Sequence, residues 1–289
     1  MSSLDATGVA QVALLALVFL TGAAVGSFLN VVIFRLPQRE SLSAPRSRCL
    51  SCGEALGVVD LVPILSYLML GGRCRHCRRS YSPRYMIVEL CTGLTALGAV
   101  MVLGLTLQAV LAFIAIACLI VIFFIDLDHF IIPDETVAIV AAVGVILDVM
   151  MLAQHGRSVA VVFNERLSPD LAYEIVLPMS LVGMAVGAGA FVVIAFVAER
   201  LFKRPGLGWG DVKLAAAMGA LLGPGYQFLT FFLVAVVIGA IVGIICMVVG
   251  RCGRRDYIPF GPMLAVSGIA MILFGDVVTP VVMSRFLLG

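Results

Sequence analysis

The chain has 289 residues, of which 62% are hydrophobic and only 12% are charged, with a formal net charge of +2. Soluble domains contain about 25% charged residues, so this composition excludes an ordinary soluble protein and predicts an integral membrane protein. The apolar blocks do not alternate polar and apolar residues, which excludes a transmembrane β-barrel. The predicted fold class is an all-α polytopic membrane protein.

Eight apolar blocks reach or approach the length of a membrane-spanning helix. The small residues of "TGAAVGS" in the first block could mark a signal peptide, but no basic segment precedes them and the block continues through "FLNVVIF", so a retained helix is favoured. We therefore expect a bundle of about eight transmembrane helices, near residues 9–34, 86–105, 108–125, 136–152, 173–202, 212–222, 227–250 and 262–288.

Lysine and arginine predict the orientation, because cytoplasmic loops are enriched in them. Nine arginines lie from Arg35 to Arg84, and two further basic groups lie at 200–213 and 251–255. Placing these three groups in the cytoplasm leaves sixteen of the nineteen basic residues inside. That arrangement requires eight crossings, with the N-terminus and the C-terminus both outside.

The block at 212–222 is too short to cross ~30 Å of hydrocarbon as a straight helix. The basic groups on either side of it nevertheless require the chain to enter the membrane and return. We expect a short, buried helix that ends at the "GPG" of 223–225. Irregular backbone at that depth needs protein or water around it, so the sequence also predicts a water-filled cavity nearby.

Two C-x2-C pairs occur between the first two apolar blocks. Cys49 and Cys52 form the first pair, Cys74 and Cys77 the second, and 21 residues separate the pairs. This spacing is close to that of a four-cysteine zinc site. Disulfides are the alternative, but the predicted cytoplasmic location is reducing. Four thiolates leave no open coordination position, so we expect a structural Zn2+ ion.

Carboxylates at the end of an apolar block are costly in a membrane and are usually functional. In "FFIDLDHFIIPDE", Asp126 ends the third block, and Asp128 would lie nearly opposite it around a helix. Asp128 with His129 could be solvated loop. Asp134 follows Pro133 and opens the next block, which favours a helix N-cap. Asp126 has no comparable structural explanation and is the first catalytic candidate.

The second candidate is Asp211 in "RPGLGWGDVKLAAAMGALLG", which also begins an apolar block, so that helix capping alone could explain it. Capping does not explain Gly206, Gly208 and Gly210, which remove side-chain bulk and let backbone or substrate approach the acid. Lys213 lies two residues beyond, on a different face of the predicted helix. The two candidate aspartates fall on the same predicted side of the membrane, which suggests a pair.

Paired carboxyls held close together cannot easily both ionise, so they share a proton and their apparent pKa values spread apart. The ionised member can take a proton from water, and the protonated member can polarise a peptide carbonyl. This is the chemistry of an aspartic protease. It needs neither a metal ion nor a nucleophilic side chain.

Residues from about 26 to 265 contain, in this order, "GSFLNVVIFRLP", the two C-x2-C pairs, "GGRC", "SPRYMIVELCTG", "DLDHFIIPD", "GLGWGDVKL" and "YIPFGPMLA". In these motifs and their order the chain resembles bacterial type IV prepilin peptidases. The resemblance implies a G-x-G-D membrane aspartic protease that removes the short basic leader of type IV prepilins and type II secretion pseudopilins. Cleavage would follow a glycine on the cytoplasmic face.

The same resemblance implies N-methylation of the new terminal residue, usually Phe, with S-adenosylmethionine as the methyl donor. The expected location is the bacterial inner membrane, multi-pass, with a periplasmic N-terminus and a cytoplasmic active site. Membrane lipid is an expected partner, and no nucleic acid is expected. Expected domains are a first helix at 1–34, a cytoplasmic zinc loop associated with methyl transfer at 35–85, and a membrane peptidase domain at 86–289.

Residue by residue, the resemblance gives Asp126, in the D-x-D motif, as the first catalytic aspartate and Asp211, in G-x-G-D, as the second. It ties Gly72 and Glu89 to methyl transfer. Gly208, Gly210 and Lys213 would support the active-site loop. The chain departs from the family pattern in an insert at 154–174, and at Leu50-Ser51, Tyr67 and Met86 near the region tied to methylation.

Three alternatives stand beside this hypothesis. A leader peptidase without methyl transfer is the nearest, but relatives of that kind lack the cysteine loop. A proton-coupled transporter could relay protons through the two aspartates, although it would favour acids in both halves of the membrane. A secretion scaffold that docks partners through the cysteine loop leaves the glycine-flanked Asp211 unexplained.

Overall fold

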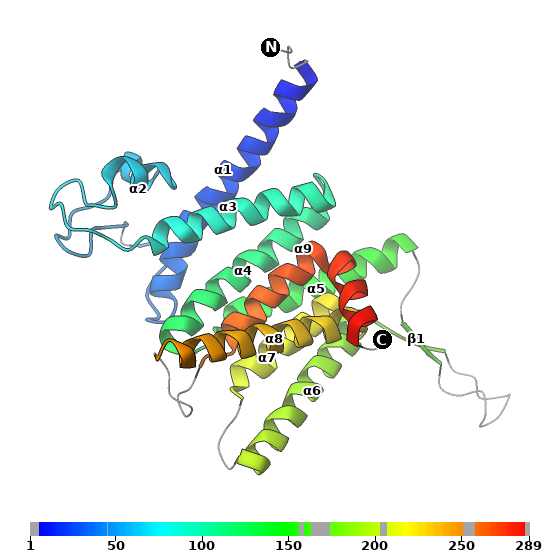
Figure 1. The fold of residues 1–289 in the computed structure, drawn as a ribbon. Helices are drawn as coiled ribbons and strands as arrows, with labels where there is room; N and C mark the ends of the chain where they lie inside the picture. Colours follow the sequence, from blue (N-terminus) through cyan, green and yellow to red (C-terminus); the bar gives the residue numbers. More distant parts are fainter. Residues whose placement is uncertain are drawn as a thin grey trace, which may run out of the picture. The chain divides into compact units, whose positions relative to one another are not determined.

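The computed structural model describes residues 6–44, 46–155, 159–162, 174–202, 207–250 and 258–286. By its internal packing the chain divides into two compact units, Met1–Val121 and Ile122–Gly289 (Figure 1). This division does not follow the three domains expected from the sequence, which stay a prediction. Among the basic groups used to predict orientation, residues 203–204 and 251–255 lie outside the described residues.

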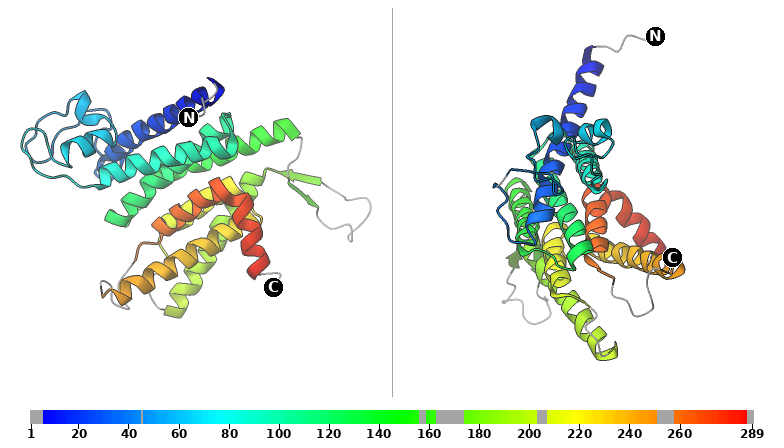
Figure 2. Two further views of the ribbon diagram at one scale, coloured as in Figure 1. Left: turned by 45° about the horizontal axis from the view of Figure 1, so that its top comes forward. Right: turned by 90° about the vertical axis from the view of Figure 1, so that its left-hand side faces the viewer.

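The first unit is built on two long helices, α1 (Ala6–Arg35) and α3 (Arg84–Leu103), which pack side by side (Figures 1 and 2). Small residues make the close approach possible: a methyl group at Gly22 would lie 2.5 Å from Cβ of Ala96, and one at Gly26 would lie 2.7 Å from Cα of Glu89. Helices in lipid associate through such small-residue contacts. Glu89 therefore sits directly at the helix crossing.

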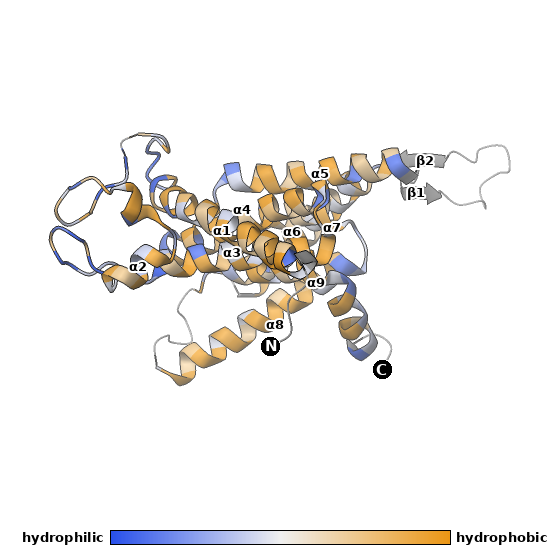
Figure 3. Cartoon of the chain, turned by 90° about the horizontal axis from the view of Figure 1, so that it is seen from above, coloured by the Kyte–Doolittle hydropathy of each residue, from blue (hydrophilic) through white to orange (hydrophobic). Residues whose placement is uncertain are grey.

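The segment between these helices holds the four cysteines and two short elements, a 3-10 helix η1 (Val58–Leu61) and α2 (Leu65–Leu70). Gly71 ends α2 in the left-handed conformation, with φ of 59°. Hydrophilic residues alternate with hydrophobic ones here, whereas the long helices are hydrophobic over most of their length (Figure 3). This segment is therefore the polar part of the first unit.

Helix α4 (Leu107–His129) begins in the first unit and ends in the second. Its end is a tight reversal: the Phe130 N–H donates to the Asp126 carbonyl, and Phe130 has a positive φ of 57°. Helix α5 (Asp134–His155) starts four residues later. The reversal places Asp126 in the last turn of one helix, next to the start of another.

Besides the end of α4, the second unit contains the helices α5, α6 (Met179–Phe202), α7 (Trp209–Leu222), α8 (Tyr226–Val248) and α9 (Gly261–Phe286). Helix α7, yellow in Figure 1, packs against the other four. Glycines allow this: Gly183 of α6 meets Gly219 of α7, and a methyl at Gly144 of α5 would lie 2.7 Å from the carbonyl carbon of Ala220. Asp211, in the first turn of α7, is consequently buried.

Seven helices among the described residues are long and apolar enough to cross a membrane, namely α1, α3, α4, α5, α6, α8 and α9. The all-α membrane fold is thus confirmed. Helix α7 has 14 residues, about 21 Å of helix, and most of it is buried, as the sequence predicted for a short enclosed helix. The water-filled cavity expected beside it stays a prediction.

One predicted boundary was wrong. The block at 173–202 does not begin as a helix, because Glu174–Leu177 forms a strand, β2, that pairs antiparallel with Val159–Val162, β1. The helix starts only at Met179, after Pro178. Apolar and β-branched residues suit either a strand or a helix, which explains the error. The rest of the insert lies outside the described residues.

Candidate functional sites: a thiol cluster and two aspartates

The two cysteine pairs fold into matching knuckles. In the first, the Cys49 N–H donates to the Glu54 carbonyl at 2.8 Å and the Gly53 N–H donates to the Cys49 carbonyl at 2.9 Å. In the second, the Cys74 N–H donates to the Arg79 carbonyl at 2.9 Å and the Arg78 N–H donates to the Cys74 carbonyl at 3.0 Å. The same backbone bonds therefore shape both turns.

The knuckles differ at the residue with positive φ. Gly53 has a φ of 75°, which glycine adopts without cost. Arg78 occupies the equivalent place with a φ of 59°, a conformation that costs about 1 kcal/mol for a residue with a Cβ atom. The sequence indicated the first turn through its glycine. It gave no signal for the second.

The sulfur atoms of Cys49, Cys52, Cys74 and Cys77 lie within 4.8 Å of one another, and those of Cys49 and Cys77 are 3.9 Å apart. All four are free thiols, so the structure does not support the alternative that they form disulfides. In a tetrahedral zinc site, Zn–S bonds of ~2.3 Å place the sulfurs about 3.8 Å apart. The four residues could therefore hold a metal ion of this size.

The four thiols also influence each other's ionisation. Backbone N–H groups of Cys52 and Ser51 lower the pKa of Cys49 to about 6. A hydrogen bond from the Glu54 N–H lowers the pKa of Cys52. Desolvation and the neighbouring thiols outweigh this effect and raise the pKa to about 11. Crowded thiols cannot all ionise without a cation among them. Since thiolate is the form that binds metal, this crowding favours an ion at the centre.

Asp126 lies in the last turn of α4 and is only 5% exposed. The N–H of Gly261, the first residue of α9, is its backbone hydrogen-bond partner. A methyl group at Gly261 would lie 2.5 Å from Oδ2 of Asp126 and 3.1 Å from Cδ1 of Ile132. The positive end of a helix dipole favours a carboxylate at this place. Gly261 thus allows α9 to approach the acid.

Asp211 lies in the first turn of α7, outside the seven candidate spans, and is 4% exposed. Its Oδ2 accepts the N–H of Gly208 at 3.0 Å, so it does cap its own helix, as one interpretation of the sequence allowed. Burial, together with the negative charge of Asp126, raises the pKa of Asp211 to about 6, against the opposing effect of the Gly208 N–H. The two carboxyls are therefore within electrostatic reach of each other.

The glycines before Asp211 have different surroundings. A methyl at Gly210 would lie 3.0 Å from Cβ of Ile132, and one at Gly208 would lie 3.4 Å from Oδ2 of Asp211. Gly210 therefore keeps the start of α7 close to the α4–α5 loop, which carries Ile132. Gly206 lies outside the described residues.

Lys213 and Asp134 form an ion pair that the sequence did not predict. The Lys213 Nζ lies 2.7 Å from Oδ1 of Asp134, and both side chains are exposed. Asp134 was expected to be an N-cap, but it is the first residue of α5 and its carboxylate contacts Lys213 instead. This ion pair therefore links the start of α5 to the start of α7.

Glu89 borders a cavity in the first unit, and Gly72 lies against Tyr67, which also borders this cavity. Gly72 has a φ of 65°, and a methyl there would lie 2.8 Å from the ring of Tyr67. Glu89 is 8% exposed, and its Oε2 accepts the N–H of Ile64 at 2.8 Å. Sequence reasoning named Tyr67 only as a departure from the family pattern, and it missed Tyr81, Tyr85 and Gly261. The glycine of "YIPFGPMLA" was the only signal for Gly261.

The fold and these sites define a polytopic membrane protein with two buried aspartates in its second unit and a four-thiol cluster in its first. Two family models match the chain. The bacterial peptidase A24 N-terminal domain matches residues 20–103, and the type IV leader peptidase family matches residues 113–244. The chain belongs to the type IV leader peptidase family.

Several curated relatives match most of the chain. A prepilin leader peptidase/N-methyltransferase of Burkholderia pseudomallei is 32% identical over 287 residues, covering 90% of this chain and 85% of the relative. Another of the same name, from Aeromonas hydrophila, is 31% identical and covers 94% of both chains. A type 4 prepilin-like proteins leader peptide-processing enzyme of Escherichia coli is 35% identical, covering 87% of this chain and 90% of the relative. No solved structure matches.

Proposed function

We propose that this protein cleaves the basic leader from type IV prepilins and type II secretion pseudopilins and then N-methylates the new terminus. The observation that supports the peptidase half is that Asp126 and Asp211 are buried carboxyls from separate helices and that the charge of Asp126 acts on Asp211. The names of the relatives support both halves. The site would face the cytoplasm of the bacterial inner membrane, as the basic residues predict.

In the proposed cleavage, one aspartate is ionised and the other carries a proton. The ionised carboxylate takes a proton from water as the water oxygen bonds to the peptide carbonyl carbon, while the protonated carboxyl donates to the carbonyl oxygen. The C–N bond then breaks as the nitrogen receives a proton. The positive ends of α7 and α9 favour the negative charge that the pair carries throughout.

The methyl donor proposed is S-adenosylmethionine, and the metal proposed for the thiol cluster is Zn2+. When bound, zinc would tie the two knuckles together and stabilise the loop. Cys49, Cys52, Cys74 and Cys77 would fill all four coordination positions, so we assign the ion a structural role. In a loop this small, such an ion replaces the core that the loop cannot build.

Purified protein incubated with a prepilin and labelled S-adenosylmethionine tests the proposal. Mass analysis should show loss of the leader and addition of one methyl group. Asp126→Asn or Asp211→Asn should abolish cleavage, and parental rates in either variant would contradict the pairing. Serine substitution at all four cysteines should remove bound zinc; one equivalent of zinc remaining by elemental analysis would contradict the metal site.

A further inference from the structure

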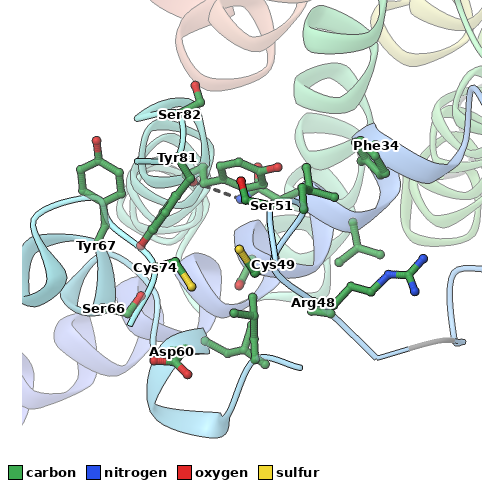
Figure 4. Close-up of a pocket in the computed structure, with 18 of the residues that line it drawn as sticks. Phe34, Arg48, Cys49, Ser51, Asp60, Ser66, Tyr67, Cys74, Tyr81 and Ser82 are labelled. Atoms are coloured by element: carbon green, nitrogen blue, oxygen red, sulfur yellow. Dashed lines mark hydrogen bonds between the residues drawn. The ribbon is translucent and has the colours of Figure 1, made fainter. Parts of the chain in front are cut away.

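A cavity of about 800 Å3 lies in the first unit, between α1, the cysteine loop and α3. Cavities of roughly 300–1,000 Å3 bind small ligands and cofactors. Figure 4 shows the rings of Tyr67 and Tyr81 at this cavity, close to Cys74. The cavity therefore has the size of a cofactor site and lies beside the thiol cluster.

A buried carboxylate lines the cavity. Glu89 is 8% exposed, and its partners among the described residues are the N–H of Ile64 at 2.8 Å and the hydroxyl of Ser27, which are both neutral. A carboxylate removed from water without a cationic partner is costly. A ligand that brings a positive charge into the cavity would offset that cost.

Three tyrosines add an aromatic wall. The rings of Tyr67 and Tyr81 meet edge to face with centroids 5.3 Å apart, and those of Tyr81 and Tyr85 do so at 6.1 Å. The charge of Glu89 acts on Tyr81, since it adds to the burial that raises the pKa of this phenol. Aromatic faces near a carboxylate are the surroundings that bind onium cations.

Gly72 and Ile64 hold this wall in place. The Gly72 N–H donates to the Tyr67 carbonyl, and its own carbonyl accepts the Tyr81 N–H, both at 2.9 Å. Ile64 has a φ of 64°, which is an outlier for a β-branched residue. Its N–H donates to Glu89. Strain of this kind clusters at functional sites, and here it directs an N–H group at the buried acid.

We propose that this cavity binds S-adenosylmethionine, with the sulfonium held by the Glu89 carboxylate and the ring of Tyr81. The proposal rests on the methyltransferase half of the proposed function and deepens it. Arg48 and Arg79 also line the cavity and supply the positive charge that the carboxylate of the ligand needs. Gly72 acts as a positioning residue, because any side chain there would displace the ring of Tyr67.

The transfer balances without a further reactant. The terminal ammonium of the cleaved pilin first releases a proton to solvent. Its nitrogen lone pair then bonds to the methyl carbon, and the S–C bond breaks with its electrons going to sulfur. The positive charge passes from sulfur to nitrogen, which leaves a neutral thioether. A site that recognises the sulfonium therefore discriminates the donor from S-adenosylhomocysteine, the spent product.

Binding measurements test the site without relying on turnover. Full-length protein in detergent is titrated with radiolabelled S-adenosylmethionine and with S-adenosylhomocysteine. Glu89→Gln keeps an acceptor for Ile64 but loses the charge, so it should weaken binding of the sulfonium about tenfold and spare the thioether. Tyr81→Leu should weaken sulfonium binding several-fold, whereas Tyr81→Phe, which keeps the ring, should bind nearly as the parent does.

Glu199→Gln is the control, because Glu199 is an exposed acid on α6 that lines neither the cavity nor the thiol cluster. Metal content of each variant checks that the loop is folded. Unchanged sulfonium binding in Glu89→Gln and Tyr81→Leu, or equal losses for both ligands in Glu89→Gln, would overturn the site. If the parent protein methylates a cleaved pilin but the substitutions leave S-adenosylmethionine binding unchanged, only the proposed binding site is wrong. If the parent protein neither cleaves nor methylates, the proposed function itself is wrong.

Discussion

Substitution of Gly261 by alanine should impair cleavage through Asp126. The added methyl would lie 2.5 Å from Oδ2 and 3.0 Å from Cγ of Asp126, whereas ordinary contacts begin at 3.4 Å. The carboxyl or the start of α9 must therefore move by about 0.9 Å, and misplacement of ~1 Å costs about 100-fold in rate. We expect kcat to fall by about that factor while KM for the prepilin changes little.

The assay is cleavage of a purified prepilin by full-length protein in lipid vesicles, followed over a range of substrate concentrations. Gly189→Ala in α6 is the control, since a methyl there meets nothing within 4 Å and alanine favours a helix. Helix content by circular dichroism shows whether each variant is folded. A folded Gly261→Ala protein that cleaves within threefold of the parental kcat would refute the contact.

Three further predictions concern charge and backbone strain. The pKa of Asp211 is raised from 3.8 to about 6. Ionisation of this side chain therefore lowers the free energy of unfolding by roughly 3 kcal/mol above pH 6 and has no effect on it below pH 4. Asp211→Asn should therefore unfold at a higher temperature than the parent at pH 7.5 but not at pH 4, and equal melting temperatures at both pH values would contradict the assignment. Arg78→Gly relieves a φ of 59° and should stabilise the second knuckle by about 1 kcal/mol, measured as slower metal loss to a chelator; faster loss would count against it. Lys213→Ala breaks an exposed ion pair worth less than about 1 kcal/mol, so cleavage should stay within threefold, whereas a loss beyond tenfold would assign this lysine a direct role in the chemistry.

The sequence determined the features that depend on neighbouring residues along the chain. Apolar length predicted the spans, because a helix must hide its backbone from lipid within its own segment. The two C-x2-C pairs predicted the thiol cluster, since each knuckle is a local turn closed by its own backbone bonds. Asp126 stood out because it is an acid at the end of an apolar block.

Only the tertiary structure decided which distant residues meet. Gly261 lies 135 positions after Asp126 in the chain. No local pattern shows that its N–H contacts Asp126 or that its lack of a side chain makes room for that acid. The residues around Asp134 predicted a helix N-cap, but α5 packs beside α7 and the carboxylate of Asp134 forms an ion pair with Lys213. The cavity with Glu89 and the tyrosines exists because small residues let α1 approach α3. Such contacts depend on the shapes of surfaces brought together by folding, and the order of residues alone does not contain them.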